Sequence, residues 1–174
     1  IPCDELHDQP ATTAAIQEFW ELYESVAIDA EPLIPLQPPY DEHYQTLTEA
    51  GLGHDKYALG GIAVDDIGTS EQIRLIEGFR RVAPDAYAHA LGVGGGMQFV
   101  RQVAGSGLVD SVDCATPEMA GQFGCVLDAR LRQQEVRVMS GDGARKRNMA
   151  LSEFNSWQIQ DVWDRECDRA QGLD

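Results

Sequence analysis

Residues 56–64 read KYALGGIAV, an apolar run that contains paired glycines. This pattern is typical of a short buried strand that leads directly into a loop. Three other apolar runs follow the same plan and end at Leu36-Gln37, at Leu91-Gly92 and at Asp113-Cys114. A helical pattern of apolar side chains separates each run from the next. The alternation of strands and helices predicts parallel β/α units, whose strands end at one common edge of a sheet.

The expected elements cover the first two thirds of the chain. We expect strands at residues 32–36, 56–64, 86–91 and 108–114. We expect helices at residues 11–28, 40–50, 70–82 and 97–104, the first capped by Thr12 or Thr13 and the third by Ser70. The chain has 174 residues, whereas a complete (β/α)8 barrel needs roughly 250. The sequence therefore predicts an α/β protein that is a partial (β/α)8 barrel of the TIM type, with the carboxyl-terminal strands. Since the chain starts at Ile1, we expect it to be part of a longer protein.

The pattern changes after residue 117. We therefore expect two domains, a barrel portion at residues 1–117 and a mixed helical extension at residues 118–174. Residues 117–140 have no clear period, and residues 151–167 read as an amphipathic helix. Its apolar residues are expected to lie inside: Phe154, Trp157, Ile159, Val162 and Trp163. This helix could close the bottom of a barrel or pack on a partner.

The chain is strongly acidic, with 29 Asp and Glu against 13 Lys and Arg and a net charge of −16. Binding to nucleic acid phosphates normally needs Lys and Arg, and only Lys56 and Lys146 are lysines. One interpretation is a halophilic protein, because the Debye length falls to roughly 3 Å at 1 M salt and repulsion from phosphate is then weak. The alternative is an ordinary acidic protein with small-molecule substrates.

The cysteines and the hydropathy indicate a location. None of the four cysteines lies at C-x-x-C spacing, and nothing suggests disulfides. No segment is long and apolar enough to cross a membrane. We therefore expect a cytoplasmic protein without a membrane partner.

Asp113 is the first candidate for chemistry, since it ends an apolar run and should lie at the mouth of a barrel. A carboxylate in that position can attack an anomeric carbon and hold a covalent glycosyl intermediate. The alternative is a structural Asp that caps the turn before Thr116-Pro117.

Four motifs, taken in order, resemble those of the tRNA-guanine transglycosylase superfamily. The stretch from Asp4 to Thr12 is similar to the family pattern Phe-Asp-Glu-Cys-x-x-x-Pro-Ala-Thr. Gly60-Gly61 lies in a match to Gly-Gly-Leu-Ala-Val, and residues 91–94 match a Gly-x-Gly segment. Residues 110–117 are similar to Asp-x-Phe-Asp-Cys-x-x-Pro. Each motif has an ordinary alternative: Asp4 could be an acidic residue in the first turn of a helix, and residues 92–96 could be a loop that binds a nucleotide phosphate. The resemblance therefore depends on the whole set of motifs in this order.

The resemblance implies exchange of a guanine in a nucleic acid, DNA or tRNA, for a 7-deazaguanine base. It makes Asp113 the nucleophile and Asp4 the acceptor for the Watson–Crick edge of the base. Gln37 and the N–H of Gly61, beside Gly60, would donate to the base carbonyl, and Leu91 would pack on the base face. No cofactor is expected, because the family's zinc ligands, three Cys and a His, are absent from this chain. A dimer or a partner domain would supply the rest of the barrel.

The departures from the family pattern keep other functions open. Pro38-Pro39 replaces the Gly-Gly that follows Gln37 in relatives, and Val112 replaces a Phe. The region of the family's general acid/base Asp is absent, and no arginine follows Thr116-Pro117, where enzymes that act on tRNA carry two. The chain is therefore more similar to the divergent DNA deazaguanine transglycosylases. The alternatives are a non-catalytic base-binding or partner subunit, and an unrelated β/α-barrel enzyme acting on a small metabolite.

Overall fold

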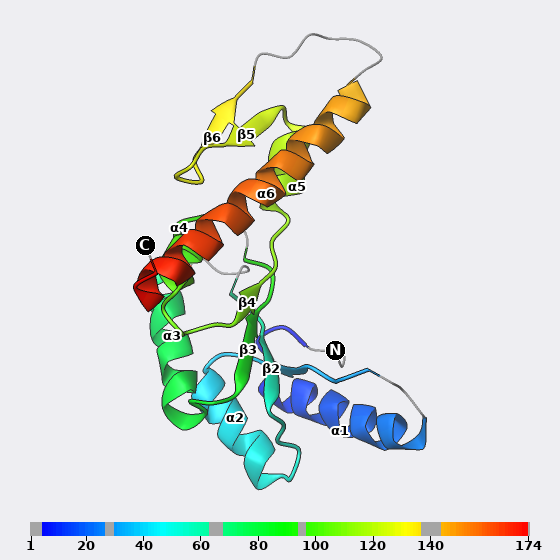
Figure 1. The fold of residues 1–174 in the computed structure, drawn as a ribbon. Coiled ribbons are helices and arrows are strands. Elements are labelled where there is room, and N and C mark those ends of the chain that lie inside the picture. Colours follow the sequence, from blue (N-terminus) through cyan, green and yellow to red (C-terminus); the bar gives the residue numbers. More distant parts are fainter. Residues whose placement is uncertain (1–4, 27–29, 63–67, 94–96, 137–143, 174) are drawn as a thin grey trace. The chain divides into compact units, whose positions relative to one another are not determined.

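The computed structural model describes residues 5–26, 30–62, 68–93, 97–136 and 144–173 (Figure 1). The chain divides into two compact units. The first contains residues Ile1–Gly92 and Leu108–Asp113, and the second contains Val93–Gly107 and Cys114–Asp174.

The first unit is built on a four-stranded parallel sheet in the order β1-β2-β3-β4. The strands are β1 (Ile34–Leu36), β2 (Lys56–Leu59), β3 (Tyr87–Ala90) and β4 (Ser111–Val112). Helices α1 (Gln9–Ser25), α2 (Tyr40–Glu49) and α3 (Thr69–Val82) belong to the same unit. The predicted alternation of parallel strands and helices is confirmed. The strands are shorter than expected, and the part of the second expected strand at residues 63–64 lies outside the described residues.

An aromatic cluster joins α2, β2 and α3. The ring of Tyr57 lies 5.4 Å from that of Tyr44 and 5.6 Å from that of Phe79, and Tyr44 and Phe79 are 5.8 Å apart. Tyr57 and Phe79 are completely buried; burial of each such side chain contributes about 2 kcal/mol. These helices therefore cover the face of the sheet to which Tyr57 points. Since side chains alternate along a strand, Lys56 and Ala58 point to the opposite face.

Two helices begin differently from the prediction. Asp8, not Thr12 or Thr13, caps α1, because its carboxylate accepts the backbone N–H of Ala11 at 2.9 Å. Thr12 is instead buried, and its hydroxyl exchanges hydrogen bonds with the backbone of Glu5. The Ser70 cap was also wrong, because α3 begins one residue earlier, with Gly68 as its N-cap.

The second unit contains two helices packed closely together, α5 (Thr116–Gln122) and α6 (Ala144–Gln171). It also contains α4 (Met97–Val103) and a hairpin of β5 (Cys125–Leu127) and β6 (Gln133–Glu135). The buried amide of Asn155 on α6 joins these parts, since it accepts from Leu127 N at 2.7 Å and donates to Cys125 O at 3.1 Å. Long helix α6 extends the predicted helix at both ends.

The expectation that all the aromatic residues of α6 lie inside was wrong. Ile159 and Val162 are buried, but Phe154 and Trp157 are 42% and 60% exposed. Asn155, Ile159 and Val162 recur at helical spacing and form a narrow buried stripe, which leaves Phe154 and Trp157 on other faces. Among the described residues, no helix is long and apolar enough to span a membrane.

Candidate functional site

Four of the predicted site residues fall in one row across the sheet. Leu36, Leu59, Ala90 and Val112 are paired neighbours on successive strands. The next residue on each strand is Gln37, Gly60, Leu91 and Asp113, respectively. Hydrogen bonds extend the pairing into this row: Gly60 N donates to Leu36 O, Leu91 N to Leu59 O, and Asp113 N to Ala90 O, at 2.9, 3.0 and 3.3 Å. These residues therefore share the carboxyl edge of the sheet. Asp4 lies outside the described residues.

Asp113 presents a half-exposed carboxylate at this edge. Its side chain is 57% exposed. The Oδ1 atom accepts the backbone N–H of Gly92 at 2.7 Å and lies 3.2 Å from Nε2 of His89. Gly92 turns the chain with φ of +60°, a conformation that glycine adopts without a steric penalty. Both donors reach the same oxygen, so the carboxylate has a fixed orientation.

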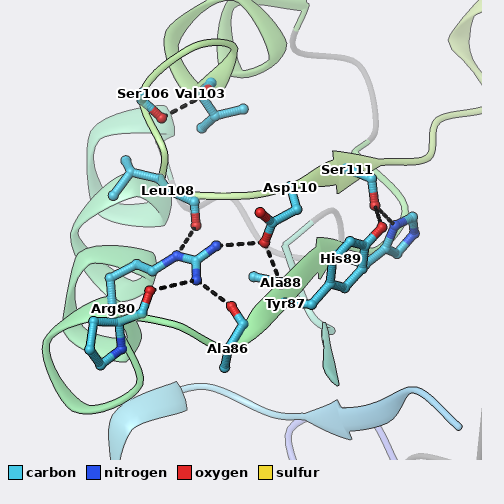
Figure 2. A network of polar contacts seen from close by, with 11 residues as sticks. Arg80, Ala86, Tyr87, Ala88, His89, Val103, Ser106, Leu108, Asp110 and Ser111 are labelled. Atoms are coloured by element: carbon cyan, nitrogen blue, oxygen red, sulfur yellow. Dashed lines mark hydrogen bonds and ion pairs between the residues drawn. The ribbon is translucent and has the colours of Figure 1, made fainter. Parts of the chain in front are cut away.

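His89 continues into a chain of polar side chains on the same sheet face. Its Nδ1 lies 2.6 Å from Ser111 Oγ, which lies 2.6 Å from the hydroxyl of Tyr87 (Figure 2). The sequence alone did not single out His89 as a site residue. The available signal was the period-two spacing of Tyr87 and His89 on one strand and of Ser111 and Asp113 on the next.

Gln37 is held from several sides and is completely buried. Its Oε1 accepts the backbone N–H of His7 at 3.0 Å, and its own N–H donates to Nδ1 of His43 at 2.9 Å. The Nε2 of His43 lies 3.0 Å from Thr13 Oγ1. Since Nδ1 accepts a hydrogen bond, the proton of the neutral ring is on Nε2. Burial lowers the pKa of His43 from 6.5 to about 4, so the ring is neutral at pH 7.

Gly60 and Gly61 lie close to Leu36 and Pro38, the two residues that flank Gln37 in the sequence. Tyr40 donates its hydroxyl to Gly60 O at 2.7 Å, and burial raises the pKa of that phenol. Gly61 has φ of +75°, and a Cβ there would lie 3.2 Å from Pro38 Cδ and 3.3 Å from His7 Cε1. The conformation and the close approach both favour glycine.

Asp110, the other acid of the nucleophile motif, has a structural contact. Its Oδ2 accepts from Arg80 Nη2 at 2.8 Å and from Ala88 N at 2.7 Å (Figure 2). Arg80 also donates through Nε to Leu108 O at 2.8 Å and through Nη1 to Ala86 O. This network joins the end of α3 to the segments that lead into β3 and β4. It therefore helps to fix the register that places Asp113 beside His89.

Within the described parts of the chain, no group of three His, Cys, Asp or Glu residues has the arrangement of a metal site. In the comparisons with known proteins, no family model matches the chain and no curated protein is similar to it.

Proposed function

We propose that this chain carries the nucleophile and part of the base pocket of a transglycosylase that exchanges guanine in a nucleic acid for a 7-deazaguanine base. The observation that carries the proposal is the row formed by Gln37, Gly60, Leu91 and Asp113. These residues belong to separate motifs, yet the strand register brings them to one sheet edge. The carboxyl edge of parallel strands is where β/α barrels place their sites.

The chemistry follows from the position of Asp113. A carboxylate oxygen forms a bond to the anomeric carbon as the bond from that carbon to guanine breaks, and guanine departs with the electron pair and takes up a proton. The incoming base then loses the proton of its attacking ring nitrogen to solvent, forms a bond to the same carbon as the bond to Asp113 breaks, and releases Asp113 as carboxylate. The target base must leave its stack to reach the site. The sheet is then four strands of a (β/α)8 barrel, which other residues or a partner complete.

The base pocket would use Leu91 and Gln37 from the row, together with Gly61 and Asp4. Leu91 would pack on the base face, while the Gly61 N–H and Gln37 would donate to the base carbonyl, with Asp4 on the Watson–Crick edge. Gln37 is buried beneath the backbone of His7. Base binding through its side chain therefore requires the segment before α1 to shift.

A covalent adduct tests the proposal directly. The full-length protein is incubated with guanine-containing DNA or tRNA and free guanine in molar KCl, and the products are separated under denaturing conditions. We expect a protein–nucleic acid adduct that is lost in Asp113→Asn and retained in the control Asp85→Asn, which changes an exposed carboxylate before β3 at the opposite end of the strands. An adduct that survives in Asp113→Asn contradicts the assignment.

A non-catalytic base-binding subunit is the second candidate. It is favoured by the engagement of Gln37 and by the charge of −16, which repels phosphate. Guanine binding without any adduct or exchange would support this function.

A further inference from the structure

We infer that His89 is a positioning residue for the Asp113 nucleophile, an inference that rests on the proposed function. The two side chains lie two rows apart on the same face of adjacent strands, and His89 Nε2 is 3.2 Å from Asp113 Oδ1. His89 is the more enclosed partner, with 19% of its side chain exposed against 57% for Asp113. The imidazole therefore anchors a carboxylate that reaches into solvent.

The polar chain behind His89 sets its tautomer. A carboxylate has only acceptors, so Nε2 must carry the proton that it donates to Asp113. In the neutral ring Nδ1 is then an acceptor and takes the hydroxyl proton of Ser111 at 2.6 Å. The Ser111 oxygen in turn accepts from Tyr87 at 2.6 Å. Each group in this series of hydrogen bonds therefore has one role. The last donor, the Nε2–H of His89, is directed at Asp113.

The two donors on Asp113 select which oxygen reacts. Gly92 N and His89 Nε2 both bind Oδ1. No hydrogen bond from another described residue reaches Oδ2 of Asp113. The lone pairs of Oδ2 therefore remain available, and we expect Oδ2 to form the bond to the anomeric carbon. Loss of His89 would leave Oδ1 with the Gly92 N–H, so the carboxylate could turn about that one hydrogen bond, and a misplaced reacting group can cost about 100-fold in rate.

The test compares His89→Ala and His89→Gln with the wild type in the full-length protein. The glutamine amide keeps a donor near the position of Nε2. His54→Gln is the matched control, because His54 precedes β2 at the opposite end of the strands and accepts from Lys56 N at 3.1 Å. The rate of adduct formation with guanine-containing DNA or tRNA is measured beside the Kd for free guanine.

We expect His89→Ala to slow adduct formation by about 100-fold with the guanine Kd unchanged. His89→Gln should recover part of this loss in rate, and His54→Gln should form the adduct at the wild-type rate. Adduct formation at the wild-type rate in His89→Ala would overturn the inference and leave the proposed function intact. A parallel loss of guanine affinity, or no recovery in His89→Gln, would also overturn it. Absence of any adduct in the wild type would overturn the proposed function, and the role of His89 with it.

A spectroscopic measurement is independent of activity. The ¹⁵N NMR signals of labelled histidine should show the Nε2–H tautomer for His89, and Asp113→Asn should shift its Nε2 signal. An Nδ1–H tautomer would contradict the direction of the hydrogen bonds that we infer from Tyr87 through Ser111 to His89.

Discussion

Acidification should weaken the first unit through a single buried histidine, His43. Its Nδ1 accepts from Gln37 N, so protonation at that atom destroys the hydrogen bond and places a charge where the side chain is completely buried. The pKa of His43 is lowered from 6.5 to about 4 by burial. Because the folded-state pKa lies below the unfolded-state value, the stability is fully present above pH 6.5 and is lost as the pH falls toward 4.

The size of the loss follows from the same two pKa values. Over the whole interval they correspond to about 3 kcal/mol, of which about 2 kcal/mol should be lost by pH 5. This is a large part of the roughly 5–15 kcal/mol that stabilises a typical domain. The same change should loosen Gln37, since His43 holds its backbone N–H.

The assay is urea unfolding between pH 7.5 and 4.5, with His43→Gln as the reference. Glutamine has a similar size and does not titrate, so the difference between the two proteins removes the contributions of the carboxylates and the other histidines. We expect the wild type to lose about 2 kcal/mol more than the variant between pH 7.5 and pH 5. Parallel pH profiles for the two proteins would refute the buried neutral histidine.

Three further predictions concern packing, the Arg80 network and salt. Gly121→Ala should destabilise the second unit by about 2 kcal/mol in thermal unfolding, because the new Cβ would lie 2.3 Å from Ser152 Oγ. The control Gly53→Ala should be nearly neutral, because the closest contact of its new Cβ is at 3.6 Å. Arg80→Met should lower the free energy of unfolding in urea by about 2 kcal/mol, because its charged hydrogen bonds are lost. The control Arg74→Met, on the same helix but in an exposed ion pair, should lower it by less than about 1 kcal/mol. Equal losses in the two variants would contradict the role of the Arg80 network. The free energy of unfolding should rise with KCl concentration, since the charge of −16 repels itself, and a protein fully folded at low salt with no further gain would count against adaptation to high salt.

The sequence predicted the alternation of strands and helices because short apolar runs and amphipathic segments have different periods. It also predicted that Gln37, Leu91 and Asp113 lie at the ends of successive strands, whereas Gly60 lay inside the expected strand 56–64 and in the structure follows the end of β2. Their arrangement in one row depends on strand register, which is set by long-range packing and by contacts such as that of Arg80. Only a structure could therefore show that these residues form one row.

Other features left little local signal. Strand β6 is Gln133–Glu135, three exposed polar residues without the apolar alternation of a strand. The exposed positions of Phe154 and Trp157 depend on which narrow stripe of α6 contacts α5, and helical periodicity alone does not select that stripe. The contact of His89 with Asp113 joins residues 24 positions apart and requires the register of β3 with β4.

Exchange of radiolabelled guanine most directly tests whether Asp113 serves base exchange. The full-length protein is supplied with DNA and with tRNA separately, in molar KCl, and label in each polymer is counted for the wild type and for Asp113→Asn. We expect incorporation into one of the two polymers by the wild type and none by the variant. Failure of the wild type to label either polymer, while free guanine still binds, would contradict a catalytic role and favour the base-binding subunit.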